Sequence, residues 1–364
     1  MNKYKVCVYA ICKNEEKFVE RWINSMKESD YIIVCDTGST DNTVEKFKSL
    51  GIDPTCTNIS PWRFDEARNQ CIDLIPEDVD ICICTDLDEL LQPGWREILE
   101  QNWQPNTKQA RYTFVWSSDE NGHPLKTSIA VKIHARKDFK WIYPVHEVLD
   151  YFGEDPFIMT DIYDLKVHHL QDHAKSRAQY LPLLELSAEL YPDYDRNIHY
   201  LGREYMYHGK YNECIETLKR HLSLPTALWC DERAASMRYI AHSYQSLGDM
   251  VSAKNWLLRA IAESPFTREP YLAMAKLAYK LHDWALLYWI CESALRISHP
   301  TGSYLDEPEC WGYLFDDFAG LSCYRLGLGD KAIEFAQKAL SYSPDDIRLQ
   351  NNLQFCLDRF KNKE

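Results

Sequence analysis

The sequence contains no pair of cysteines spaced as C-x-x-C, although it has 13 cysteines. Zinc modules of the usual spacing are built on such pairs, so a module of that kind is not expected. Cys82 and Cys84 lie in an apolar run in which side chains alternate between faces, so they point in opposite directions. We interpret most of the thiols as small buried apolar residues of a protein in a reducing compartment.

Long hydrophobic segments are also missing. No run of about 18 apolar residues occurs, so no membrane-spanning helix is expected. The first residues, Met1 to Tyr4, lead directly into a strand-like pattern without the apolar core of a signal peptide. These two observations predict a cytoplasmic protein.

Basic residues are the minority among the charged ones. Lys and Arg number 41 against 55 Asp and Glu, which gives a formal net charge of -14. This balance argues against a nucleic-acid partner, whose phosphates are neutralised by Lys and Arg, and weakly against an anionic membrane surface. It leaves room for a local basic pocket that binds a phosphate.

The length of 364 residues exceeds what one hydrophobic core usually serves, so two domains are expected.

The first half of the chain alternates between strand and helix signals. Apolar runs predict strands at 6–12, 31–35, near Thr55 and at 81–85. Helical patterns cover 15–27, a segment that ends at Gly51, and 64–74. Asn42 and Glu45 have the spacing of a capping box at the start of the second helix. Strands alternating with helices predict a doubly wound, mostly parallel sheet.

Between about residues 109 and 169 the pattern changes. Residues 111–116 and 127–134 are strand-like and are joined by a segment that contains Asn121-Gly122. They predict a hairpin added to the parallel sheet. The α/β catalytic domain is therefore expected to cover residues 1–172.

From about residue 176 onward helical periodicity replaces the strand signals. Small residues recur at Gly202, Ala241, Ala275 and Gly320, with offsets of 39, 34 and 45 residues. Tetratricopeptide repeats have a period of about 34 residues and small residues where paired helices touch. We therefore expect an all-α helical repeat domain over residues 173–364, with an irregular helical bundle as the alternative.

The acidic motif Asp86-Leu87-Asp88 is the strongest chemical signal. It directly follows the predicted strand Ile81 to Thr85. In open α/β sheets ligands bind beyond the carboxyl ends of the strands. Two carboxylates at that place suit Mg²⁺ or Mn²⁺, which can stabilise a diphosphate leaving group. The alternative is a solvated acidic turn or a helix N-cap.

Two further segments carry polar groups at the expected edge of the sheet. Asp36 ends a strand and is followed by a turn with Gly38 and Ser39, where its carboxylate could accept a hydrogen bond from a nucleobase. The alternative is an ordinary strand–turn–helix cap. Arg68 lies near the start of a helix whose N-terminus could face a phosphate. The alternative is a surface arginine after an acidic first turn.

The last candidates follow the hairpin. Glu147, beside His146, is our candidate for a general base, and His169 or His168 is the candidate for a further metal ligand. A histidine that stands alone is more often structural, and this alternative stays open for each of them.

Four motifs appear in an order that resembles a known family. They are Cys12-Lys13-Asn14-Glu15-Glu16, Asp36-Thr37-Gly38-Ser39-Thr40-Asp41, Phe64-Asp65-Glu66-Ala67-Arg68-Asn69 and Asp86-Leu87-Asp88-Glu89. Together they resemble the family 2 glycosyltransferases of GT-A fold, and most closely a bacterial branch that carries C-terminal tetratricopeptide repeats. The His146-Glu147 and His168-His169 pairs and the segment Leu201 to Tyr205 also resemble that branch.

The resemblance implies an inverting sugar transfer from an NDP-sugar, with UDP as the expected nucleotide. It implies that Asp36 with Gly38 and Ser39 recognises the uracil, that Asp88 is the principal metal ligand, and that a downstream histidine completes the coordination. Further donor contacts implied by the resemblance are Cys12, Lys13, Asn14, Glu15, Arg68, Asp86 and Leu87. Thr37 replaces a second acid of the common pattern, and Ile11-Cys12-Lys13 replaces Pro-Thr-Tyr, so the base and the sugar stay open.

The sequence therefore predicts a glycosyltransferase that uses Mn²⁺ or Mg²⁺ and acts on a peptide, protein or glycan acceptor. Self-association through the helical repeats is a further option. The alternative from another class is a repeat-based interaction module with an inactive transferase half. A nucleotidyltransferase would carry a Gly-rich phosphate loop near the first strand, and none is present. A haloacid-dehalogenase-type phosphatase would carry a small hydroxylated residue where Leu90 stands.

Overall fold

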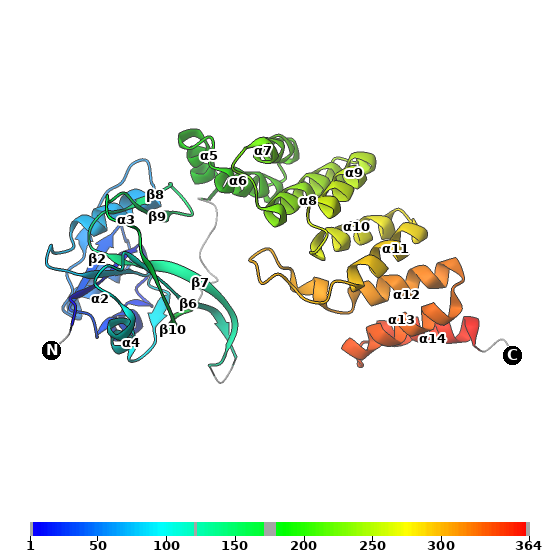
Figure 1. Cartoon of the computed structure of the whole chain (residues 1–364), viewed down its shortest axis with the longest axis horizontal. Coiled ribbons are helices and arrows are strands. Elements are labelled where there is room, and N and C mark those ends of the chain that lie inside the picture. Colours follow the sequence, from blue (N-terminus) through cyan, green and yellow to red (C-terminus); the bar gives the residue numbers. More distant parts are fainter. Residues whose placement is uncertain (1–2, 120–121, 171–179, 362–364) are drawn as a thin grey trace. The chain divides into compact units, whose positions relative to one another are not determined.

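The computed structural model describes residues 3–119, 122–170 and 180–361 (Figure 1). It divides into two compact units, residues 1–187 and 188–364. The domain boundary expected between residues 172 and 173, and Asn121 of the expected hairpin turn, lie outside the described residues.

The first unit is built on an eight-stranded sheet in the order β3-β2-β1-β4-β7-β6-β10-β5. The strands of this sheet are β1 Val6–Cys12, β2 Tyr31–Asp36, β3 Thr55–Cys56, β4 Ile81–Cys84, β5 Glu89–Leu91, β6 Gln109–Ser118, β7 Pro124–Ala135 and β10 Met159–His169. The block β3-β2-β1-β4 is parallel, and β10 is parallel to β6. The hairpin of β6 and β7 joins this block antiparallel to β4, which confirms the predicted parallel sheet with an added hairpin. A second, two-stranded sheet contains β8 Phe139–Ile142 and β9 Val148–Tyr151.

Helices cover both faces of the sheet. Every residue of the central strand β1 is therefore buried. The side chains of Val6, Val8 and Ala10 pack in one core with α1 Val19–Met26, α2 Thr43–Ser49 and α4 Trp95–Asn102. The alternate side chains of β1 pack on the opposite face with α3 Phe64–Asp73. A strand buried on both faces needs a continuous apolar run, which is what β1 has.

Two local expectations in this unit are wrong. The first helix begins at Val19 rather than residue 15, because Asn14 has a left-handed φ of 56° and the backbone N–H of Glu15 donates to Thr43 Oγ1 at 2.7 Å. The capping box of Asn42 and Glu45 does not form, since the Asn42 side chain makes no capping hydrogen bond. The N–H of Thr43 donates instead to Asp41 Oδ1 at 3.0 Å.

The second unit consists of helices that pack against their neighbours along the chain (Figure 1). α5 Tyr180–Leu190 precedes it and reaches its first residues. The other helices are α6 Asp195–Tyr207, α7 Tyr211–Ser223, α8 Cys230–Ser246, α9 Met250–Glu263, α10 Glu269–Lys280, α11 Trp284–Leu295, α12 Leu314–Leu326, α13 Gly329–Tyr342 and α14 Ile347–Phe360, with a short 3₁₀ helix η1 at Pro308–Trp311. None of the described helices is both long enough and apolar enough to cross a membrane.

The turns inside the helix pairs show the repeat register directly. Each turn from α6 to α7, α8 to α9, α10 to α11 and α12 to α13 contains a residue with positive φ: Gly209, Gly248, His282 and Gly327. These positions are 39, 34 and 45 residues apart, the same offsets as the small residues inside the preceding helices. The helix-pair array with one repeated turn geometry is the all-α repeat architecture expected from the sequence.

Gly202 on α6 lies in close contact with a side chain of α7. A Cβ built on Gly202 would lie 2.3 Å from a terminal carbon of Leu218, which is fully buried. We expect Gly202→Ala to lower the free energy of unfolding of the helical unit by about 1–3 kcal/mol, because buried overpacking forces a side chain to move. Urea unfolding followed by far-UV circular dichroism measures the change.

Gly312 provides the matched control for this substitution. A Cβ at Gly312 meets nothing within 4 Å, and its φ of -97° is open to any residue. Gly312→Ala is therefore expected to change stability by at most about 0.5 kcal/mol, with a gain from the stiffer unfolded chain. Equal stability of the two variants would show that Leu218 moves away from Gly202 without cost.

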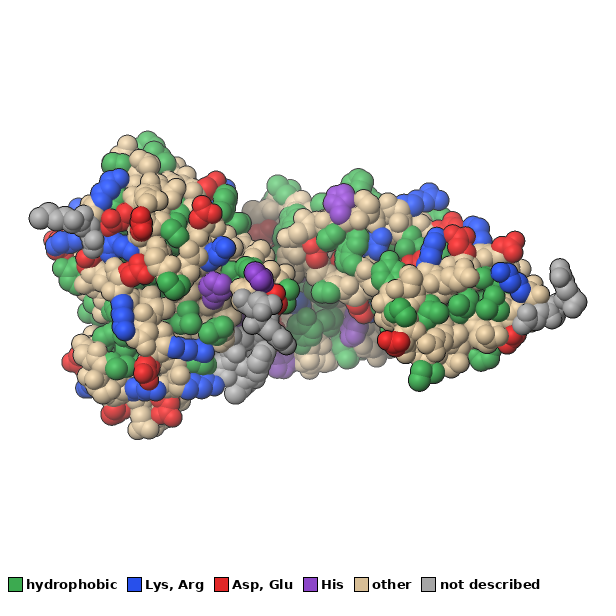
Figure 2. Space-filling view, turned by 90° about the horizontal axis from the view of Figure 1, so that it is seen from below, with side chains coloured by type: hydrophobic (Ala, Val, Ile, Leu, Met, Phe, Trp, Pro, Cys, Tyr) green, Lys and Arg blue, Asp and Glu red, His purple; other side chains and the backbone are tan. Residues whose placement is uncertain are grey.

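Both units carry mixed surface charge. In the face shown by Figure 2, acidic and basic side chains are interspersed over each unit, and no continuous basic patch covers this face.

The thiols are mostly interior: of the 13 free cysteines, only Cys56 and Cys230 are exposed. This burial agrees with the interpretation of most cysteines as apolar core residues.

Candidate active site

Asp36 organises the turn that follows β2. Its carboxylate is 2 % exposed and accepts hydrogen bonds from the backbone N–H groups of Gly38 at 3.0 Å and Ser39 at 2.9 Å, and from the Ser39 hydroxyl. Gly38 has a φ of 102°, which favours glycine at this place. Cys12, in register with Asp36 at the end of β1, donates its thiol to the carboxylate at 3.6 Å. Burial and the nearby Asp36 raise the pKa of the Cys12 thiol.

The segment after β1 is tied to the same turn. The N–H of Asn14 donates to Ser39 Oγ at 2.9 Å, and the N–H of Thr40 donates to Asn14 Oδ1 at 2.7 Å. Lys13 is exposed beside them, whereas the side chain of Glu15 is buried. The residues expected to line a nucleotide pocket thus form one hydrogen-bonded unit beyond the carboxyl ends of β1 and β2.

The two acids of the Asp86-Leu87-Asp88 motif have different neighbours. Asp86 Oδ1 accepts from Arg68 at 2.8 Å, and Asp86 Oδ2 accepts from Lys132 at 3.3 Å. Asp88 is 7 % exposed, and its Oδ2 lies 3.7 Å from Nε2 of His169. Leu87 between them is fully buried in the core, so only its backbone can face a ligand.

Arg68 binds two of the candidate acids, Asp86 and Glu147. Its Nε donates to Glu147 Oε1 at 2.6 Å, and its guanidinium also donates to Asp86 and to the Cys84 sulfur. The Arg68 side chain is buried, with the guanidinium 5.1 Å from the centre of the Trp141 ring. Burial opposes the charged form, but Asp86, Cys84 and Glu147 hold the pKa of Arg68 well above its usual value. A fixed cation therefore stands between two carboxylates.

The loop that carries Glu147 has unusual backbone geometry. Tyr143 and His146 adopt left-handed φ values of 77° and 53°, which are uncommon for residues other than glycine. The carbonyl of Pro144 accepts the N–H of Phe64 at 3.0 Å, which anchors the loop to the start of α3. Backbone outliers held in place by neighbouring structure often accompany functional sites.

Lys132 and Glu89 lie next to Asp86 and extend the network of charged side chains around Arg68. Lys132 was not identified from the sequence. Lys132 Nζ donates to Glu89 Oε1 at 2.8 Å, and the N–H of Asp86 donates to Glu89 Oε2 at 3.1 Å. Burial works against the charged Lys132, but Asp86 and Glu89 raise its pKa well above the usual value. The only sequence signal was a lysine between Val131 and Ile133 in a strand, and this spacing does not reveal its partner.

His169 and His168 end β10 and are directed differently. Successive side chains of a strand point to opposite faces, so His168 points away from the face on which His169 meets Asp88. His169 packs against the rings of Phe114 and Trp116, with centroids 5.8 and 5.5 Å away. Its Nδ1 is buried and has no hydrogen-bond partner within the described part of the chain. Burial lowers the pKa of His168.

Asp88 and His169 fit a divalent metal ion. A carboxylate oxygen and a ring nitrogen face each other at 3.7 Å, and carboxylate and imidazole are both ligands of Mn²⁺-type ions. Asp86 lies beside them but interacts with the cations Arg68 and Lys132. The geometry thus favours Asp88 and His169 over Asp86 and His168 as direct ligands.

Comparison with known proteins finds a family that is similar to the first unit. Residues 7–154 match the family model for glycosyl transferase family 2. These residues contain β2, β4, the acidic motif and all of β1 except Val6. Over these residues the first unit is therefore similar to the family 2 glycosyl transferases. No curated protein sequence matches the chain.

Solved structures resemble a part of the chain weakly. The crystal structure of MamA protein is 19% identical, covers 46% of this chain and 83% of that chain, and has a TM-score of 0.36. Pseudomonas aeruginosa PilF is 12% identical over 47% of this chain and 70% of that chain, with a TM-score of 0.37. Cut9 in the Cut9-Hcn1 complex is 13% identical over 50% of this chain and 33% of that chain, with a TM-score of 0.38.

Proposed function

We propose that the protein is an inverting glycosyltransferase that needs Mn²⁺ or Mg²⁺ and takes its sugar from a UDP-sugar. The observation that carries the proposal is the arrangement of charged side chains beyond Cys84 at the end of β4. Asp88 approaches His169 on one side, and Arg68 and Lys132 flank Asp86 on the other. Ligands of open α/β sheets bind at this edge.

In this proposal Asp88 and His169 hold the metal ion, which supplies positive charge to the diphosphate when it is bound. Arg68 and Lys132 add fixed positive charge that offsets the charge growing on the leaving diphosphate. The turn held by Asp36 positions the base. Because the Asp36 carboxylate already accepts three hydrogen bonds from its own turn, we propose that it shapes the base site as well as contacting it.

The reaction is an in-line displacement at the anomeric carbon. A bond forms between the acceptor atom and that carbon while the bond from the carbon to the diphosphate oxygen breaks. We propose that Glu147 takes the proton of the acceptor as a general base. General base catalysis raises the reaction rate by about 10²–10⁴-fold. Glu147 is held by Arg68 at 2.6 Å, so its position is fixed relative to Asp86. A peptide or protein acceptor, delivered by the helical repeats, agrees with the use of such arrays as binding surfaces.

A thermal-shift experiment tests donor binding. The melting temperature of the full chain is measured with UDP, GDP and dTDP, each with Mn²⁺, Mg²⁺ or a chelator. We expect UDP with Mn²⁺ to give the largest rise, since a ligand at 100 times its Kd stabilises the native state by about 2.7 kcal/mol. Removal of the metal should cut the shift. If no nucleotide shifts the transition with either metal, the repeat-based interaction module becomes the better description.

A further inference from the structure

Three ionisable side chains from three helices converge inside the helical unit. His199 lies on α6, His221 on α7 and Glu232 on α8. Each offers one metal-ligating atom, and these three atoms all lie within 4.8 Å of one another. Both histidines have no exposed surface and Glu232 is 6% exposed. Nothing in the transferase chemistry uses these residues.

The two histidines share one hydroxyl group. Nδ1 of His199 lies 2.7 Å from the Ser236 oxygen, and Nδ1 of His221 lies 3.0 Å from the same atom. The Nε2 atoms of both rings are buried and have no hydrogen-bond partner among the residues that the structure describes. The Nε2 of His221 is 3.4 Å from Glu232 Oε1. A buried polar atom without a partner is costly, so these two nitrogen atoms point to an additional group.

The shared hydroxyl fits the tautomers that metal binding requires. A ring nitrogen that binds a metal carries no proton, so the other nitrogen of each ring must be the N–H donor. The Ser236 oxygen has two lone pairs and can accept from both Nδ1–H groups. Both Nε2 atoms then present lone pairs. Histidine ligands of metals usually donate their second N–H to an oxygen in this way.

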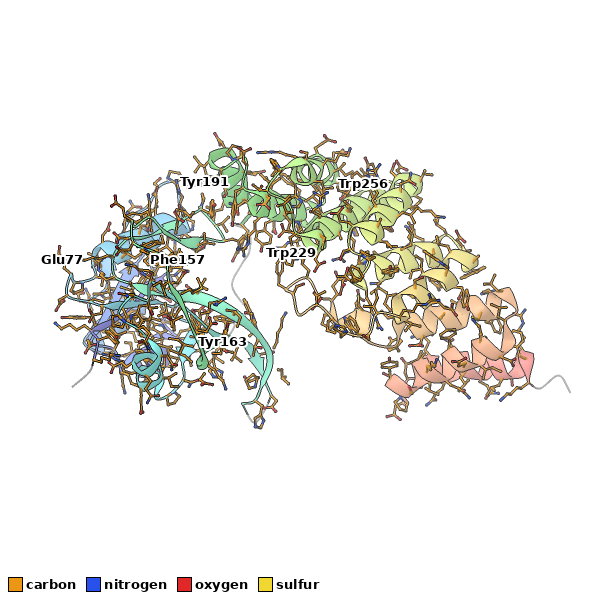
Figure 3. All side chains as sticks on the ribbon, viewed as in Figure 1. Glu77, Phe157, Tyr163, Tyr191, Trp229 and Trp256 are labelled. Carbon is orange, nitrogen blue, oxygen red and sulfur yellow. The ribbon has the colours of Figure 1, made fainter. Side chains whose placement is uncertain are left out.

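Glu232 also has a hydrogen-bond partner other than the two histidines. The Tyr304 hydroxyl donates to Glu232 Oε2 at 2.9 Å, which leaves Oε1 as the oxygen on the His221 side. Tyr304 also packs against Trp229, labelled in Figure 3.

We propose that His199, His221 and Glu232 form a zinc-class metal site that links α6, α7 and α8. Two imidazole nitrogens and one carboxylate oxygen are a common ligand set for Zn²⁺, and a water molecule would fill the fourth tetrahedral position. The site is independent of the Mn²⁺ or Mg²⁺ that the transferase unit is proposed to use. Its function is to fix the packing of the first helices of the repeat array.

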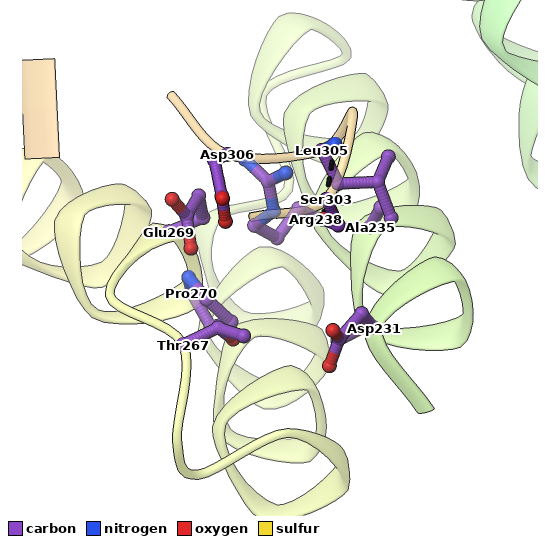
Figure 4. A pocket seen from close by; sticks show the side chains of 10 residues that line it. Asp231, Ala235, Arg238, Thr267, Glu269, Pro270, Ser303, Leu305 and Asp306 are labelled. Carbon is purple, nitrogen blue, oxygen red and sulfur yellow. Dashed lines mark hydrogen bonds between the residues drawn. The ribbon is translucent and has the colours of Figure 1, made fainter. Parts of the chain in front are cut away.

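Arg238 on α8 has its own acidic partner, since it donates to Glu307 at 2.6 Å. Figure 4 shows Arg238 in a cavity with Glu269 and Asp306. This cavity holds about 10 Å³, the room of about one water molecule, so it offers no competing site for a larger ligand.

Metal binding by the full chain tests the proposal. The chain is made with Asp88→Asn, so that the transferase residues do not contribute, and is stripped with a chelator. Zn²⁺ or Co²⁺ is then titrated at neutral pH, and bound metal is counted after dialysis. We expect one tightly bound equivalent, a raised melting temperature, and the strong visible absorption of four-coordinate Co²⁺.

Two histidine variants distinguish this site from unspecific binding. His221→Gln is expected to lose the bound equivalent and the Co²⁺ absorption. His242→Gln, on the exposed side of the same helix α8 that carries Glu232, should keep both. Equal metal content in these two variants would overturn the proposal, and so would the absence of a stoichiometric Zn²⁺ or Co²⁺ equivalent in the parent chain.

Ser236→Ala keeps all three ligands and tests the shared hydroxyl. Loss of an outer partner of this type lowers metal affinity by about 10–100-fold, so we expect a weaker but still stoichiometric site. If His221→Gln does not fold, the metal affinity of Ser236→Ala still tests whether the three residues bind the metal ion. Unchanged affinity in Ser236→Ala would contradict the proposed arrangement. Nucleotide binding by the transferase unit is measured separately and does not bear on either result.

Discussion

Asp88→Asn is expected to lower the rate of sugar transfer by about 10³-fold or more while the protein stays folded. The substitution removes the charge of the carboxylate that meets His169 at 3.7 Å, and with it the anchor for a divalent ion. A metal ion supplies several kcal/mol of transition-state stabilisation, and each 1.36 kcal/mol is a factor of ten in rate. The measurement is transfer or hydrolysis of the UDP-sugar that gives the largest thermal shift, at saturating Mn²⁺.

Asp53→Asn is the control for this prediction. Asp53 has the same chemistry, but its side chain is 83% exposed and pairs with Lys48 at 3.4 Å. It should retain the parent rate, and both variants should keep the circular dichroism of the parent. The metal-dependent part of the thermal shift with UDP should disappear in Asp88→Asn alone. Normal turnover by Asp88→Asn with Mn²⁺ present would refute the assignment of this residue.

Arg68→Met is expected to destabilise the first unit by about 3–5 kcal/mol. The substitution leaves Asp86 and Glu147 without the buried cation that binds both, and breaking a buried ion pair from one side has a cost of this size. Hydrogen exchange of the amides of β1 and β4 reports on the first unit alone. Their protection should fall by the corresponding factor, while the helices of the second unit keep theirs.

Arg111→Met is the matched control. Arg111 also binds a carboxylate through two nitrogens, but its partner Asp161 is 41% exposed, and the Arg111 side chain is 44% exposed. An exposed pair contributes about 0–1 kcal/mol, so the amides of β1 and β4 should keep nearly all of their protection. If the two arginine variants lose the same stability, the burial of the Arg68 network does not have the energetic role described here.

The arrangement of strands could be predicted because local patterns determine it. The strand β1 is a continuous apolar run buried on both faces, and the acid at the end of β2 marks where that strand stops. The offsets between small residues predicted the helix pairs, and the turns with positive φ follow the same offsets. At one of these turns His282 stands where the other turns have glycine, so a search for glycine alone would have missed it.

Contacts across long separations could not be predicted in the same way. Arg68 and Glu147 are 79 residues apart, and Lys132 reaches Asp86 from a different strand. Strand periodicity gives the face of a side chain but not its partner, so Lys132 was missed. The sequence also did not indicate that Asp36 is satisfied by its own turn, because this depends on the backbone of Gly38 and Ser39.

The buried histidine–glutamate group illustrates the same limit. The repeat pattern identified where helices touch but carried no information on polar side chains between them. His199, His221 and Glu232 lie on three consecutive helices, and only the packing of α6, α7 and α8 brings them together. Their spacing resembles no short metal motif. The role of Asp88 is tested by the Asp88→Asn variant, and the roles of Glu147 and the histidines of β10 remain predictions.

The burial of the thiols has a practical consequence. Cys56 belongs to the first unit and Cys230 to the second, and the remaining cysteines are interior. Maleimide dyes should therefore react at one position in each half of the native chain, without any engineered residue. Energy transfer between the two dyes would then report how the separation of the halves responds when donor or acceptor is added.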